Sequence, residues 1–230
     1  MGTKEYIKRT SKTIQENMSI NQVSIDIDSE LPDDVNVAKV LTTFRGSLPK
    51  GYFKKLNGIK VVDLEEFDQR NISAKYSADD KMLYISANRQ DNSDDMLDDL
   101  IHEVGHHAET LYGDFIYGDN AIKDEFIMKR MQLRFELGAD GYDYTQFNCK
   151  NTQFDPELDV FLYKRVGKEK LKMMTAGIYV RPYQSLSLQE YFAVGFEQYY
   201  LGNHKTLHRD CPVLYKRMEE LDQKVRKESR

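Results

Sequence analysis

The sequence predicts an α+β protein in which a small mixed sheet with helices precedes a mostly helical C-terminal half. Short segments of alternating apolar and polar residues occur before residue 90, whereas apolar residues at helical spacing dominate after it. The 230 residues, 40% hydrophobic and 31% charged, have the composition of an ordinary globular protein. We expect one domain over 1–230, with an α/β lobe at about 1–115 and a helical lobe at about 116–230.

The first half of the chain contains signals for both strands and helices. Turn residues and potential helix caps separate the periodic segments, so that each element has a predicted start. The predicted elements are a helix over 4–18, a strand at 23–27, a helix capped by Asp33 or Asp34 that ends near Phe44, a strand at 59–64, a hairpin turn at Asp79-Asp80 and a strand at 81–87.

A helix over about 94–112 follows the strand at 81–87. Ser93 is the predicted N-cap, Asp94 and Asp95 favour the first turn, and Gly113 is the predicted stop. Beyond it the periodicity predicts further helices near 120–137, 155–166, 168–176, 187–202 and 212–227.

The helix over 94–112 carries the stretch His102-Glu103-Val104-Gly105-His106. Residues four apart lie about 40° apart around a helix, so that both imidazoles can reach one metal ion. Glu103 lies about 100° from His102, where it reaches a metal-activated water more easily than the metal itself. The pattern predicts a zinc site with His102 and His106 as ligands and Glu103 as general base, and His107 as a packing or supporting residue.

A catalytic zinc takes three protein ligands, so the two histidines need a partner. The extended motif with a nearby third histidine fails, because positions 109 and 112 are glutamate and tyrosine. Glu190 is favoured modestly over Glu197, which shares its helix face, although Ser187 and Glu190 also form a capping-box pattern. Weaker alternatives are Glu125, Glu136 and Asp140.

Two segments resemble the peptidase domain of anthrax lethal factor and its small relatives, the Pro-Pro endopeptidases. They are the His102–His106 motif and Glu190-Tyr191-Phe192-Ala193-Val194-Gly195-Phe196. The resemblance implies a zincin-like fold of the gluzincin type, Glu190 as third ligand, and Tyr183, seven residues earlier, as the oxyanion donor. The separation of His106 and Glu190, 84 residues, is roughly double that of the family and implies inserted helices at about 114–175. A second acidic residue of the family is Val194 here.

The predicted function is that of a zinc metalloendopeptidase acting on a protein or peptide. An extended substrate is expected to pair with the edge of the strand at 81–87. Two alternatives stay open: a zincin-fold protein of weak activity that holds a protein partner in its cleft, and a metal-free structural protein with a chance motif. Retention of Glu103 favours the enzyme.

Charge and hydropathy exclude other classes. The formal charge of −5 comes without a long basic stripe, which makes nucleic acid an unlikely partner, and no segment is apolar for the length of a membrane span. Residues 1–18 lack the apolar stretch of a signal peptide, as expected of a cytoplasmic protein or of a secreted one whose signal was removed. Cys149 and Cys211 could form one disulfide or be two unrelated thiols.

Overall fold

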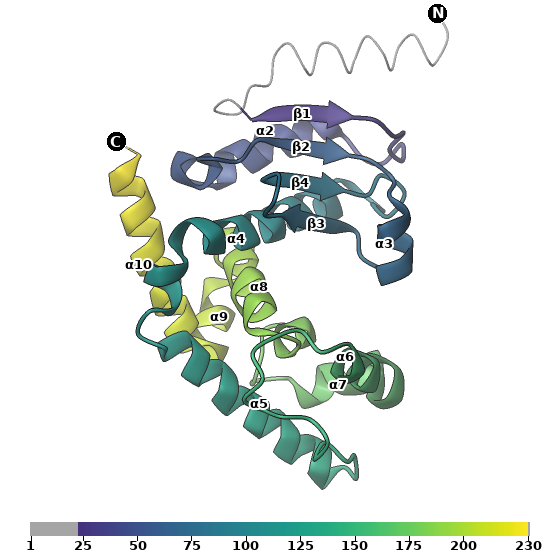
Figure 1. Cartoon of the computed structure of the whole chain (residues 1–230), viewed down its shortest axis with the longest axis vertical. Helices are drawn as coiled ribbons and strands as arrows, with labels where there is room; N and C mark the ends of the chain where they lie inside the picture. The colour runs from purple at the N-terminus through teal and green to yellow at the C-terminus, as the bar shows by residue number, and fades with distance from the viewer. Residues whose placement is uncertain (1–22, 230) are drawn as a thin grey trace, which may run out of the picture. The chain divides into compact units, whose positions relative to one another are not determined.

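The computed structural model describes residues 23–229, and these residues form an α+β structure with one four-stranded mixed sheet and mostly helices elsewhere (Figure 1). Contacts group the chain into two compact units. One extends up to Thr110 and takes in the end of the chain from Val225, and the other is Leu111–Lys224. The helix expected at 4–18 lies outside the described residues.

The sheet has the strand order β1-β2-β4-β3. Strands β1, β2 and β4 are parallel, and β3 pairs antiparallel with β4 as one arm of a hairpin, as the turn at Asp79-Asp80 predicted. The strand expected at 81–87 therefore lies inside the sheet with both edges paired, so the prediction that a substrate pairs with it is wrong. The strands are β1 (Ser24–Ile27), β2 (Gly58–Val61), β3 (Ala74–Ser77) and β4 (Met82–Ile85).

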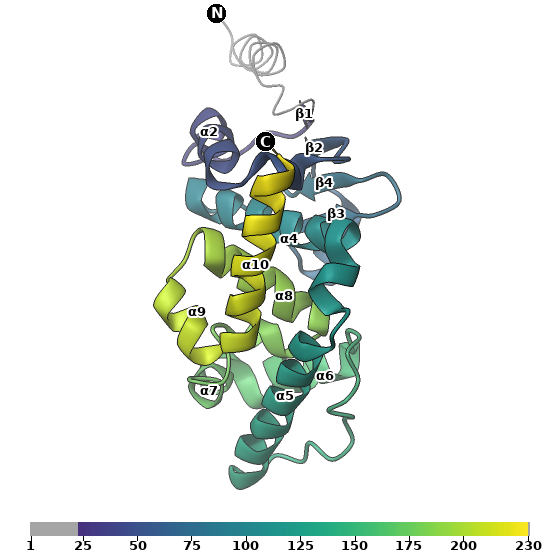
Figure 2. The ribbon, with the colours of Figure 1, turned by 90° about the vertical axis from the view of Figure 1, so that its left-hand side faces the viewer.

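One face of this sheet is apolar and covered by helices. Because side chains alternate along a strand, the paired residues Ile59 and Leu83 point to the same buried face. The next pair, Lys60 and Tyr84, stays half-exposed. Helices α2 (Val37–Ser47) and α4 (Ser93–Tyr117) lie on the same face (Figure 2). The shorter elements of this unit are η1 (Lys50–Phe53) and α3 (Glu65–Arg70).

Asparagine caps the two helices that cover the sheet. The Oδ1 atom of Asn36 accepts from the Lys39 amide at 3.0 Å, so the expected caps Asp33 and Asp34 lie outside α2. The Oδ1 atom of Asn92 accepts from the amides of residues 94 and 95 at 2.8 and 3.1 Å. Ser93, the expected cap of α4, instead accepts from the Asn36 amide at 2.8 Å and donates to Asp34.

Helix α4 does not stop at Gly113. Tyr112 leaves the helical conformation, with φ −128° and ψ 17°, and the helix then resumes to Tyr117. The predicted end at residue 112 is thus a kink. Gly113 therefore lies inside the helix, where a glycine costs about 1 kcal/mol relative to alanine and does not by itself end the helix.

The second unit is helical, as predicted. The helix expected at 155–166 divides into α6 and a π-helical segment, η2, and the short helix α9 was not predicted. The helices are α5 (Ala121–Ala139), α6 (Pro156–Val160), η2 (Phe161–Gly167), α7 (Lys168–Met174), η3 (Pro182–Ser185), α8 (Leu188–Tyr200), α9 (His204–Asp210) and α10 (Pro212–Glu228).

Two further expectations concern membrane spans and the pairing of the two cysteines. None of the helices in 23–229 is long and apolar enough to cross a membrane. Cys149 and Cys211 are both free and buried, so of the two alternatives the unpaired one holds.

Candidate metal centre

Helix α4 presents His102 and His106 one turn apart. Their ring centroids are 5.0 Å apart with an interplanar angle of 80°, and both side chains are half-buried. Glu103, between them, has only 7% of its surface exposed. The apolar flank of the motif is fully buried, so that solvent reaches these polar groups from one side of the helix only; it consists of Leu100, Ile101, Val104 and Ala108.

A carboxylate from the same helix orients the second histidine. The Oε2 atom of Glu109 lies 2.9 Å from the ring Nδ1 atom of His106. This contact leaves Nε2 of His106 as the nitrogen available to a metal, and it orients the ring as carboxylates do in zinc sites. Glu109 follows His106 by three residues, a spacing that places two side chains next to each other on a helix, and this spacing was the signal available in the sequence.

His107 anchors the motif helix to the sheet unit and is buried. One ring nitrogen lies 3.0 Å from the Tyr76 hydroxyl of β3, and the other 2.9 Å from the Lys54 carbonyl after η1. Burial lowers the pKa of His107, which keeps the ring neutral, with a donor and an acceptor nitrogen for these two partners. The supporting role expected for His107 agrees with these contacts.

Glu190 lies in the first turn of α8. The helix begins because the Ser187 hydroxyl accepts from the Glu190 amide at 3.0 Å. This cap uses the main chain of Glu190. One carboxylate oxygen of Glu190 and one ring nitrogen each from His102 and His106 all lie within 4.8 Å of one another. These three residues therefore form a group that could hold a metal ion.

The other carboxylate on this face of α8 has a different partner. Glu197 is buried and forms an ion pair with Arg181, whose side chain is 40% exposed. It is not part of the potential ligand group found in the described residues. Val194, which stands where the resembled family has a second acidic residue, is buried.

The three weaker alternatives are placed elsewhere. Glu125 is buried on α5 and accepts from the Tyr191 hydroxyl at 2.7 Å and from the Val213 and Leu214 amides at 3.0 and 2.9 Å. It therefore caps the start of α10. Glu136 is exposed, and Asp140 forms an ion pair with Lys170.

The expected oxyanion donor, Tyr183, lies in the same unit as Glu190, and the charge of Glu190 acts on a second tyrosine, Tyr163. Tyr183 is half-buried in η3, a turn held by the buried side chain of Gln184, which accepts from the Val180 amide at 2.8 Å and donates to the Tyr191 carbonyl at 3.2 Å. Tyr163, on the π-helical segment η2, was not predicted. Burial raises its pKa, and the negative charges of Asp159 and Glu190 raise it further. The sequence carried no signal for Tyr163, because its proximity to Glu190 is a tertiary feature.

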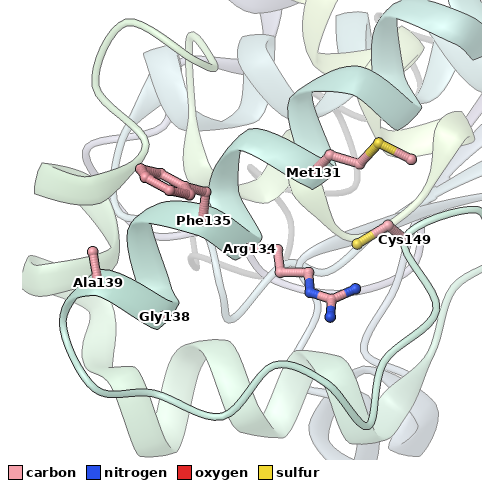
Figure 3. A pocket seen from close by; sticks show the side chains of 6 residues that line it. All are labelled: Met131, Arg134, Phe135, Gly138, Ala139 and Cys149. Atoms are coloured by element: carbon pink, nitrogen blue, oxygen red, sulfur yellow. The ribbon is translucent and has the colours of Figure 1, made fainter.

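The second unit also has a shallow groove between α5 and the loop that follows it (Figure 3). None of the predicted site residues lines it. Its lining is Met131, Arg134, Phe135, Gly138, Ala139 and Cys149.

Comparisons of the chain with protein-family models, with curated proteins and with solved structures found no match. The resemblance to lethal factor peptidases therefore stays a prediction that rests on two motifs.

The choice between the two glutamates of α8 can be tested by substitution. Glu190→Ala should weaken zinc binding by more than the roughly 10- to 100-fold typical of losing an outer partner, because a ligand is removed. Glu197→Ala should keep zinc affinity and lower stability by about 1–3 kcal/mol, since it breaks a half-exposed ion pair. Chelator competition and thermal unfolding measure the two effects. Zinc lost in Glu197→Ala and kept in Glu190→Ala would reverse the assignment.

The contact of Glu109 with His106 can be tested by a separate substitution. Glu109→Ala should raise the dissociation constant for zinc about 10- to 100-fold while the chain stays folded, because His106 loses its orienting carboxylate. Glu136→Ala, an exposed glutamate on α5, serves as the control. Equal zinc affinity in Glu109→Ala and the wild type would show that the carboxylate does not support the ligand.

Proposed function

We propose that this chain is a zinc metalloendopeptidase with a zincin-like fold of the gluzincin type. One observation carries the proposal: ligand atoms of His102, His106 and Glu190 gather within 4.8 Å, and Glu103 lies on the same helix between the histidines. Two imidazoles and a carboxylate are the donor set of known catalytic zinc sites. The set leaves the fourth position of a tetrahedral ion open.

The residues present fit such an ion. Contact with Glu109 at Nδ1 would leave Nε2 of His106 to hold the ion, and neutral imidazoles are the form that binds metals. When bound, zinc would acidify a water molecule and polarise the carbonyl of the scissile peptide bond.

Glu103 would act as the general base. Its carboxylate takes the proton of the attacking water and passes it to the leaving amine, a transfer worth typically 10²–10⁴-fold in rate. With 7% of its surface exposed, Glu103 sits where little bulk water competes for the proton. The fully buried side of α4 contributes to this environment.

Tyr183 would donate its phenolic hydrogen to the oxyanion of the tetrahedral intermediate. The role comes from the resemblance, in which a tyrosine precedes the third ligand by seven residues. The turn η3 supports it, because Gln184 holds the neighbouring main chain at both ends. A donor must be fixed in advance to stabilise charge that develops only in the transition state.

An extended peptide would pair with β3. Among the described residues β3 has one strand partner, β4, so its other edge is the one to which a strand of substrate would add. The Tyr76 hydroxyl of β3 contacts His107, the neighbour of His106. A peptide on this edge would thus be held close to the motif helix.

The substitution Glu103→Gln tests the role of the general base without removing a proposed metal ligand. The variant should bind zinc as the wild type does and cleave peptides at least about 100-fold more slowly, since the proton acceptor is lost. A proteome-derived peptide library read by mass spectrometry finds the cleaved sequence, and a fluorogenic peptide of that sequence gives rates. Wild-type rates in Glu103→Gln would contradict the proposed mechanism. A wild-type protein that binds zinc and retains a protein partner without cleaving it would favour the binding protein.

The donor is tested by Tyr183→Phe, which removes one hydroxyl. We expect kcat to fall by about 10²–10³-fold with little change in zinc affinity, as for other oxyanion donors. Tyr142→Phe, a half-exposed tyrosine of the same unit, is the matched control and should keep the wild-type kcat. A decrease in kcat of similar size in both variants would show that Tyr183 has no special role.

A further inference from the structure

A buried arginine on α5 binds the main chain just before Glu190. Arg130 is 1% exposed. Its Nε donates to the Ser185 carbonyl at 2.9 Å, and one terminal nitrogen donates to the Leu186 carbonyl at 2.6 Å. The other terminal nitrogen donates to the Asn151 carbonyl. The guanidinium therefore joins the segment at 185–186 to the inserted part of the chain.

The cost of burying this charge indicates that its contacts are specific. Several kcal/mol are needed to bring an ion out of water, and here no carboxylate pairs with the guanidinium in the contacts of the described residues. Charge-assisted hydrogen bonds to three carbonyls offset the loss, and the ring of Phe126 lies 4.7 Å beneath the guanidinium carbon. A planar fork with several donors can hold three carbonyls at once, whereas an ammonium cannot match that geometry.

Two of the three carbonyls that Arg130 holds, those of Ser185 and Leu186, lie between the two residues proposed for the site, Tyr183 and Glu190. Leu186 follows Tyr183 by three residues, and its amide donates to the Tyr183 carbonyl at 3.1 Å. The Leu188 amide donates to the Thr152 carbonyl at 2.9 Å, a second link between the insertion and the start of α8. Both links act on the main chain that carries Tyr183 and Glu190.

We propose that Arg130 is a positioning residue of the metal centre, whose guanidinium fixes the main chain from Tyr183 to Glu190 and thereby supports zinc affinity and turnover. The inference rests on the proposed function. It assigns the insertion between α4 and η3 a part in the site, since α5 supplies the guanidinium and the loop before α6 supplies a shared carbonyl.

A matched control lies next to Arg130 in the sequence. Lys129 is also buried on α5, and its ammonium donates to the Ile178 carbonyl at 2.7 Å and to the Asp210 carbonyl. Neither carbonyl belongs to the segment from Tyr183 to Glu190. Lys129→Met therefore removes a buried cation and its carbonyl contacts while it leaves the proposed positioning intact.

The experiment compares Arg130→Lys, Arg130→Ala and Lys129→Met with the wild type. Zinc alone is the first probe, by chelator competition and by the absorption spectrum of the cobalt-substituted protein, followed by kcat and KM on the fluorogenic peptide. We expect both Arg130 variants to bind zinc about 10- to 100-fold more weakly and to lose kcat by at least about tenfold. Lys129→Met should lose thermal stability but keep zinc affinity and the cobalt spectrum.

Chemical rescue keeps the test decisive where Arg130→Ala folds poorly. Guanidinium at millimolar concentration should restore zinc binding to Arg130→Ala, and methylammonium should not, because only the first reproduces the planar fork. Wild-type zinc affinity in both Arg130 variants, or equal losses in Lys129→Met, would overturn the positioning role. A wild type that binds no zinc and cleaves no peptide would instead overturn the proposed function, and the inference with it.

Discussion

The site depends on one geometric constraint, the spacing of four residues that brings His102 and His106 to one side of α4. That spacing is useful only if the helix is continuous through the motif and held in one rotation about its axis. Continuity comes from the cap at Asn92 and from the absence of a break before Tyr112. The rotation is held by His107, whose two ring nitrogens contact β3 and the end of η1. Three histidines in six positions thus divide into two potential ligands and one anchor.

Local features of the fold could be predicted, and features that depend on tertiary contacts could not. Strands β1, β2 and β4 and most helices follow from residue periodicity, which is a property of each segment alone. The cap of α4 was misplaced because Asn92 and Ser93 are both good cap residues, and the contact of Ser93 with Asn36 decides between them. Strand β4 was placed at an edge because its second partner, β3, is a short polar strand with no clear alternation. Helices α3 and α9, of 6 and 7 residues, were not predicted, because two helical turns or fewer give only a weak periodic signal.

The candidate site likewise combines residues that could be predicted from the sequence with residues that could not. The two histidines and Glu103 follow from helix geometry, and the contact of Glu109 with His106 could have been read from its spacing. Glu190 and Glu197 could not be separated by pattern, because seven residues along a helix return to the same face. What separates them is the ion pair of Glu197 with Arg181. Arg130 carried no signal, since an arginine on a helix is exposed in most proteins.

The buried charges of α5 hold several distant segments of the second unit in defined positions. Glu125, Lys129 and Arg130 each bind main-chain groups of other segments, and their partners include the start of α10, the end of α9 and the turn before α8. Apolar packing tolerates small shifts of one segment against another, whereas hydrogen bonds from a buried ion weaken steeply with distance and angle. Irregular segments form few backbone hydrogen bonds of their own, so contacts with a buried ion stabilise their position most. Breaking one of them leaves buried polar groups unsatisfied, so displaced arrangements are costly. Apolar contacts alone would stabilise this helical unit without fixing the exact position of each segment, whereas the buried charges of α5 do both.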